Sequence, residues 1–214
     1  MYLGIDFLIT SDLRPYVVEV NLGLPGGAQE YDLTHQVNFG KPSDIFRRIE
    51  ETSHQIYGKT FKDYLHTLPF IESLKPFKIW MDGMGPLPDA FHPGLRLEDK
   101  WIQYQLISPL VPMPETMIFD PFNLIEAERF LEKKGKIVMK RRLGRGGRDL
   151  QVISDRETLR SQGPDSKQKI LQEYIGSRID GHTLSIRSIA FGGEFMCMYS
   201  NLSSRATSNH GVLI

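Results

Sequence analysis

The sequence contains a single cysteine, Cys197, so no disulfide can form within the 214-residue chain. None of its six histidines lies near a cysteine or another histidine at the spacing of a zinc site. Since the chain has neither a disulfide framework nor a zinc motif, its composition favours a reducing compartment, and we expect a cytoplasmic protein.

The sequence also lacks an excess of charge of either sign. Its 26 basic residues balance its 26 acidic residues, so the whole protein has no electrostatic attraction to nucleic acid or to an anionic membrane. No segment approaches the roughly 18 apolar residues that a membrane-spanning helix needs. We therefore expect neither nucleic acid nor a membrane as a partner, and any preference for charged ligands must be local.

Short apolar segments separated by turn residues predict an α+β fold. Residues 2–10 and 15–21 are rich in Ile, Val, Phe and Tyr and predict a β-hairpin. Helices are predicted over residues 43–57, 98–107 and Leu124–Lys134. The later strands are predicted over residues 116–119, 136–142, 149–154, 169–175, 182–191 and 194–202.

A basic, glycine-rich segment is the first candidate site. Residues 137–153 predict a strand, a glycine-rich loop and a second strand, and the window from Lys133 to Arg148 holds eight basic residues and no acidic one. Glycines allow backbone N–H groups to approach an anion, while Lys140, Arg145 and Arg148 could neutralise a polyphosphate. A strand follows the loop, which excludes a Walker A or dinucleotide motif. The alternatives are an exposed hairpin with a basic tip and an RGG-like RNA contact.

The first predicted hairpin is the second candidate site. Glu19 and Asn21 are two residues apart on one strand and therefore point to the same face, and Asp6 on the partner strand can lie beside them. Two carboxylates and an amide oxygen are hard donors of the kind that Mg²⁺ takes. The alternative is the solvated polar face of an edge hairpin.

Polar and charged residues among the last strands form the third candidate site. The set is Glu173, Asp180, Arg187, Asn201, Arg205 and Asn209. Either Arg187 or Arg205 would suit the stabilisation of charge on a transferring phosphoryl group.

Together these segments resemble the ATP-grasp superfamily, whose fold holds ATP between two α+β lobes with antiparallel sheets. Residues 98–116, EDKWIQYQLISPLVPMPET, are similar to the family segment that begins with an Asp-Lys pair, with Lys100 as the nucleotide-facing lysine. Residues 137–147, IVMKRRLGRGG, resemble the lysine and glycine-rich lid over the phosphates. Residues 171–175, LQEYI, resemble the hinge strand that contacts adenine.

The first hairpin completes the resemblance. Residues 4–27, GIDFLITSDLRPYVVEVNLGLPGG, are similar to the family's closing hairpin, in which an Asp and a Glu-x-Asn bind magnesium. The resemblance thus implies ATP and Mg²⁺ as cofactors, with Asp6, Glu19 and Asn21 as metal ligands. It implies nucleotide contacts at Lys100, Lys140, Arg145, Gly146, Gly147, Glu173, Tyr174, Ile175 and Asp180. Its implied catalytic residues are Lys140, Arg187 and Arg205.

The order of these motifs differs from the family's usual order, because the magnesium hairpin comes first. This order suggests a circular permutation. The implied parts are a metal-binding hairpin of the C-terminal lobe (1–30), a helical connector (31–95), a nucleotide-binding lobe with its lid (96–175) and the rest of the C-terminal lobe (176–214). Family members usually have a helix before this hairpin. Here that helix is either lost or replaced by residues 43–57, or else residues 1–27 and 96–214 do not complete one site within a single chain. In that last case the site would be completed by a second chain, as in a homodimer, or by the other half of a larger product.

The resemblance implies a ligase. Phosphoryl transfer from ATP to a small carboxylate would give an acyl phosphate, which an amine or thiol then attacks. Two alternatives use the same nucleotide residues: a small-molecule kinase on this fold, and a module that binds ATP without turnover.

Overall fold

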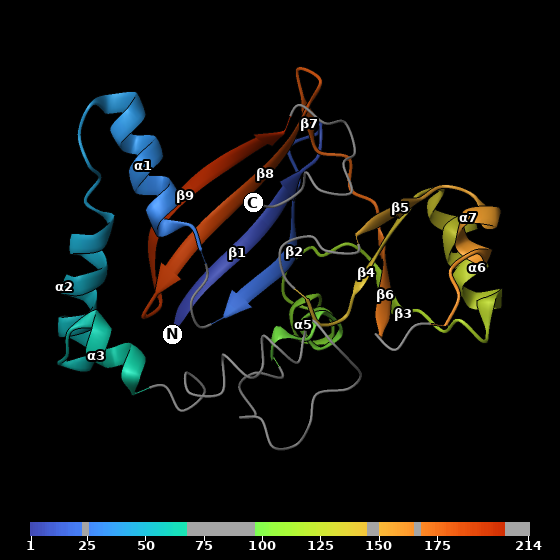
Figure 1. Ribbon diagram of the computed structural model, residues 1–214, viewed down its shortest axis with the longest axis horizontal. Helices are drawn as coiled ribbons and strands as arrows, with labels where there is room; N and C mark the ends of the chain where they lie inside the picture. Colours follow the sequence, from blue (N-terminus) through green and yellow to red (C-terminus); the bar gives the residue numbers. More distant parts are fainter. Residues whose placement is uncertain (23–25, 68–96, 145–149, 165–167, 204–214) are drawn as a thin grey trace.

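The computed structural model describes residues 1–22, 26–67, 97–144, 150–164 and 168–203. Within these ranges the chain forms two antiparallel sheets, each with helices packed on one face (Figure 1). The predicted α+β class is therefore confirmed.

The larger sheet joins the first hairpin to the last strands. β1 (Tyr2–Ile9) pairs with β2 (Pro15–Leu22) on one side and with β8 (His182–Phe191) on the other. β8 also pairs with β7 (Arg178–Ile179) and with β9 (Glu194–Ser203). Segments from opposite ends of the described chain thus lie side by side in one sheet (Figure 1).

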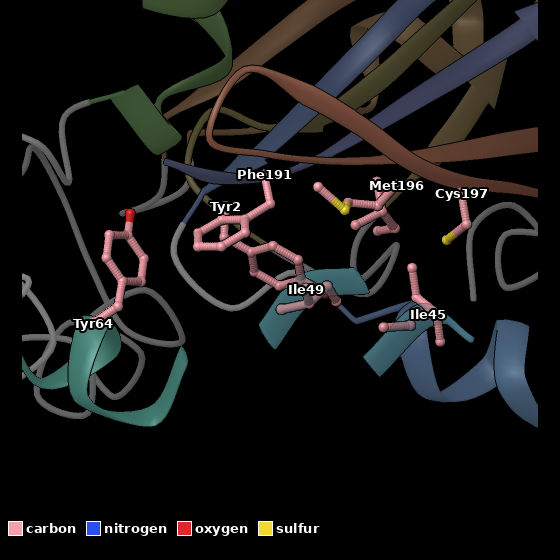
Figure 2. Packing of buried hydrophobic residues seen from close by; sticks show 9 residues of the cluster. Tyr2, Ile45, Ile49, Tyr64, Phe191, Met196 and Cys197 are labelled. Carbon is pink, nitrogen blue, oxygen red and sulfur yellow. The ribbon is translucent and has the colours of Figure 1, made fainter. Parts of the chain in front are cut away.

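Three helices cover one face of the larger sheet: α1 (Ala28–Phe39), α2 (Ile45–Tyr57) and α3 (Phe61–His66). Ile45 and Ile49, four residues apart on α2, are buried against the sheet, as Figure 2 shows. The helix predicted over residues 43–57 is confirmed, although it begins at Ile45. No helix in the described part of the chain is long and apolar enough to cross a membrane.

The smaller sheet has its helices on one face and a lysine on the other. Its strands, in spatial order, are β3 (Thr116–Ile118), β6 (Lys169–Glu173), β4 (Ile137–Arg141) and β5 (Gln151–Ile153). α6 (Leu124–Lys134) and α7 (Arg156–Arg160) pack over Ile137 and Met139 of β4. Because side chains alternate along a strand, Lys140 points to the opposite face, where it contacts β2 of the larger sheet.

α5 (Lys100–Ile107) connects the two sheets. Asp99 begins it by accepting hydrogen bonds from the N–H groups of Trp101 at 2.9 Å and Ile102 at 3.4 Å. Asp99 also accepts two bonds from Arg142 Nε, at 2.9 and 2.7 Å. This double use of Asp99 fixes the start of α5, and therefore Lys100, beside the end of β4.

Phe191 should be essential to the core of the larger sheet. Its side chain is 0% exposed and packs against the rings of Tyr2, Tyr57, Phe61 and Tyr64. We expect Phe191→Ala to lower the free energy of unfolding by about 3–5 kcal/mol, measured by urea denaturation. The control Phe195→Ala, in the same β8–β9 hairpin but 57% exposed, should cost less than about 1 kcal/mol. Equal losses in the two variants would contradict this packing.

Candidate active site

Six residues predicted from separate segments meet where β1 and β2 face α5 and β4. They are Asp6, Glu19, Asn21, Lys100, Lys140 and Arg187. All six belong to one chain, so the described contacts need no second subunit to bring them together.

Asp6 is the most deeply buried member of this cluster, with 1% of its surface exposed. The register places it opposite Glu19 on β2 and opposite Arg187 on β8. Its carboxylate accepts hydrogen bonds from Arg187 Nε at 2.6 Å, Arg187 Nη2 at 2.8 Å and Asn21 Nδ2 at 2.9 Å. Burial raises the pKa of Asp6, and the hydrogen bonds from Arg187 and Asn21 oppose that rise.

Glu19 faces two lysines from the other side of the junction. Lys100 Nζ lies 3.3 Å from Glu19 Oε1 and donates to the Gly144 carbonyl at 2.5 Å. Burial raises the pKa of Glu19, but the charges of Lys100 and Lys140 outweigh it and hold the pKa below its usual value. The Glu19 carboxylate is therefore ionised at neutral pH.

A β-bulge in β2 brings Lys140 into the cluster. Asp6 pairs with Glu19 while Phe7 pairs with Val17, so Val18 is the extra residue. Lys140 Nζ donates to the Val18 carbonyl at 3.3 Å. Burial lowers the pKa of Lys140 to about 8; Glu19 opposes this shift and Lys100 adds to it.

The cluster suits a polyphosphate with a divalent cation. Its three cations outnumber its two carboxylates, which favours an anionic ligand. Among the described residues, no group of three or more His, Cys, Asp or Glu side chains could hold a metal ion alone. Asp6, Glu19 and Asn21 instead offer two carboxylates and an amide, and Mg²⁺ commonly takes one or two carboxylates with phosphate oxygens and water. The donor set therefore fits Mg²⁺ bound together with a phosphate ligand.

The predicted hinge residues lie where the chain passes from the smaller sheet to the larger. Glu173 ends β6, and its carboxylate accepts a hydrogen bond from Lys134 Nζ at 2.9 Å. Lys136 Nζ lies 4.4 Å from the centroid of the Tyr174 ring. Ile175 is buried, with 9% of its surface exposed. These contacts fix the connection between the sheets.

Asp180 is not brought together with the six residues. It forms a two-residue turn with Gly181 between β7 and β8, with φ values of 48° and 80°. An Asp-Gly pair with both φ angles positive is typical of a type I′ hairpin turn. This turn directly precedes β8, which begins at His182, roughly 17 Å along the strand from Arg187. The turn conformation accounts for Asp180 without a ligand.

Five remaining candidates lie outside the residues that the structure describes: Arg145, Gly146, Gly147, Arg205 and Asn209. Asn201 lies on β9 and is paired with Ser185 of β8.

The sequence does not predict two further residues at the junction. Gln103 on α5 hydrogen-bonds to both backbone groups of Val20, between Glu19 and Asn21. Tyr199 on β9 is paired with Arg187 in the strand register, and burial raises its pKa. The one sequence signal for Gln103 is its place three residues after Lys100, on the same side of the predicted helix.

The family model of the ATP-grasp domain matches residues 97–210, more than half of the chain. The chain belongs to the ATP-grasp family. The match begins just before α5 and includes the smaller sheet and β7 to β9, so it contains Lys100, Lys140 and Arg187. Three other site candidates are outside the match: Asp6, Glu19 and Asn21. Asp6 on β1 is paired with Arg187 of the matched segment, and Glu19 and Asn21 lie on β2, which pairs with β1.

The whole chain is similar in fold to a solved structure. That structure is a candidate gamma-glutamylcysteine synthetase from Methylobacillus flagellatus KT, with a TM-score of 0.50 and 9% sequence identity. The similarity covers 100% of this chain and 77% of that one. No curated protein matches this sequence. At this identity the likeness shows the fold.

The buried Lys140 predicts a specific dependence of stability on pH. Folding lowers its pKa from 10.5 to about 8, so the unfolded chain binds more protons at this residue between these pH values. The contribution of Lys140 to the free energy of unfolding should therefore rise as the pH rises through this window. The free energy of unfolding of Lys140→Met, minus that of the wild type, should therefore fall as the pH rises from about 8 to about 10.5. Urea denaturation of both proteins across this range measures the difference.

The control is Lys133→Met on α6, since the Lys133 side chain is 63% exposed. Its stability relative to wild type should stay constant over the same range. If the difference in free energy of unfolding between Lys140→Met and the wild type is also independent of pH, folding does not lower the pKa of Lys140 and the prediction is wrong.

Proposed function

We propose that this protein is a Mg·ATP-dependent ligase that activates a carboxylate as an acyl phosphate for attack by an amine or thiol. The observation that carries the proposal is the convergence of two carboxylates, Asn21 and three cations at one junction between the sheets. ATP-grasp enzymes in general use ATP and Mg²⁺. The solved neighbour carries the name of a candidate gamma-glutamylcysteine synthetase, which agrees with a ligase.

Asp6, Glu19 and Asn21 would hold Mg²⁺ in this proposal. Bound there, Mg²⁺ would neutralise charge on the phosphate oxygens of ATP. The two carboxylates already lie opposite each other on β1 and β2, which favours a shared ligand. In the described geometry Arg187 contacts Asp6 and Lys100 contacts Glu19. On metal binding, Mg²⁺ would replace these two cations as the partner of the carboxylates.

Three cations would bind the phosphates and the transferring group. Lys100 and Lys140 reach the junction from α5 and β4, and we assign them to phosphate oxygens. Arg187 would stabilise charge on the phosphoryl group in transit, with Arg205 as the alternative. Phosphoryl transfer relies mainly on positioning and charge neutralisation, so these residues suffice without a general base.

The other predicted contacts complete the proposed nucleotide site. Arg145, Gly146 and Gly147 would cover the phosphates. Glu173, Tyr174 and Ile175, at the connection between the sheets, would contact adenine. Asp180 would contact the ribose only if the ligand extends towards its turn, which makes it the weakest member of the set.

The reaction class can be tested by trapping. ADP release is measured with Mg·ATP across a panel of small carboxylates, with hydroxylamine present. A ligase of this type should form a hydroxamate together with ADP, because hydroxylamine attacks an acyl phosphate. A stable phosphorylated product without hydroxamate would indicate the kinase alternative, and ATP binding without ADP release would indicate a binding module.

Glu19 provides the most direct test of the metal assignment. We expect Glu19→Gln to lower Mg²⁺-dependent ADP release by roughly 100-fold or more, because a neutral amide is a poorer ligand than a carboxylate. Thermal unfolding should show that the variant still folds. The matched control is Glu51→Gln on α2, whose side chain is 60% exposed. Full activity in Glu19→Gln would remove Glu19 from the metal site.

A further inference from the structure

β2 is the edge strand of the larger sheet, and beyond it no strand lies among the residues that the structure describes. Alternate residues of an antiparallel strand direct their N–H and C=O groups away from the neighbouring strand. Val20 is such a residue on the outer edge of β2. Buried backbone groups need hydrogen-bond partners, so this edge has to be satisfied by something other than a strand.

The side-chain amide of Gln103 satisfies both groups of Val20. Its Oε1 accepts from the Val20 N–H at 3.0 Å, and its Nε2 donates to the Val20 carbonyl at 2.6 Å. Nε2 also donates to the Leu97 carbonyl at 2.7 Å. Gln103 is only 4% exposed. A glutamate would keep the acceptor and lose the donor, and a methionine of similar length would lose both.

The same edge is held at two further points. Glu98 Oε1 accepts from the Leu22 N–H at 2.7 Å. The Val17 N–H donates to the Pro112 carbonyl at 2.9 Å. Residues on both sides of α5 therefore follow the edge of β2 in place of a neighbouring strand, with Gln103 at the centre.

Gln103 joins the two halves of the proposed site. It lies one helical turn after Lys100, and Val20 lies between Glu19 and Asn21 in the sequence. One amide thus fixes the distance between the helix that carries Lys100 and the strand segment that carries two of the proposed metal ligands. The 3.3 Å contact between Lys100 and Glu19 spans the same gap.

We propose that Gln103 is a positioning residue that sets Glu19 and Asn21 in place for Mg²⁺ opposite Lys100. The inference rests on the proposed function and adds a residue that touches neither metal nor nucleotide. β2 remains paired with β1 along its length, so loss of the Gln103 amide should shift the strand edge and leave the sheet formed. Small displacements of metal ligands are sufficient to weaken a site.

The test measures ATP affinity by titration calorimetry, once with Mg²⁺ and once with EDTA. The wild type should bind ATP more tightly with Mg²⁺. In Gln103→Met, the gain in ATP affinity that Mg²⁺ provides should be at least roughly 10-fold smaller than in the wild type. The affinity for ATP in EDTA should stay unchanged. Gln103→Glu should act in the same direction, because it cannot donate to Val20. The control is Gln105→Met, an exposed position on the same helix, which should match the wild type.

Amide hydrogen exchange gives a second readout that needs no ligand. The Val20 amide should exchange slowly in the free wild type, although it lies on a strand edge, and should exchange faster in Gln103→Met. Amides of β1 should be unaffected.

The outcomes separate the two proposals. If the wild type does not bind ATP, or binds it equally with and without Mg²⁺, the proposed function fails. If the wild type shows the gain and both variants retain it, the role of Gln103 is overturned. An equal loss in Mg²⁺ and in EDTA, or unfolding of both variants, would make Gln103 a structural brace and would also overturn it.

Discussion

The buried carboxylate of Asp6 and the partly buried carboxylate of Glu19 place the strongest constraint on this structure. Asp6 is almost fully buried and Glu19 lies beside it, and a carboxylate without a nearby cation would be costly in such a place. The cations come from three other elements: Arg187 on β8, Lys100 on α5 and Lys140 on β4. Arg187 meets Asp6 within the larger sheet, whereas Lys100 and Lys140 reach β2 from outside it. The charges of these two lysines therefore also help to hold the two sheets against each other.

This arrangement also prepares the junction for a ligand under the proposed function. In the described geometry the carboxylates and cations satisfy one another. A divalent cation that takes over Asp6 and Glu19 would leave Arg187, Lys100 and Lys140 free to meet phosphate oxygens. Mg²⁺ would replace the cations beside the carboxylates, and the phosphates would replace the carboxylates beside the cations. Binding of the metal and binding of the nucleotide would thus favour each other. The backbone contacts of Gln103 and the bulge at Val18 keep both groups within reach during that exchange.

The sequence predicts most of this architecture, because its signals are local. Alternating apolar residues predict both sheets, and the helix over Leu124–Lys134 has the predicted bounds. The sequence predicts a helical connector over residues 31–95 but does not delimit α1 within it, because Leu33, Val37 and Phe39 lie on the exposed side and mark no buried face. α7 is also not predicted, since its five residues give too short a pattern and it depends on the cap formed by Asp155.

The site is predictable in its residue types and less so in its contacts. Asp6, Glu19, Asn21, Lys100, Lys140 and Arg187 meet as a set that motif resemblance suggests. The partners of Gln103 could not be inferred from the sequence. Val20 is 83 residues away, and its backbone N–H and C=O groups do not depend on which residue type stands at that position. The circular permutation suggested by the order of the motifs stays a prediction.

A crystal structure with Mn²⁺ and a non-hydrolysable ATP analogue would test the central claim most directly. The account predicts an anomalous Mn²⁺ signal bound by oxygens of Asp6, Glu19 and Asn21, with the triphosphate against Lys100 and Lys140. The Asp6–Arg187 and Glu19–Lys100 pairs should be opened in that complex. A nucleotide or metal bound elsewhere, with both ion pairs intact, would contradict it.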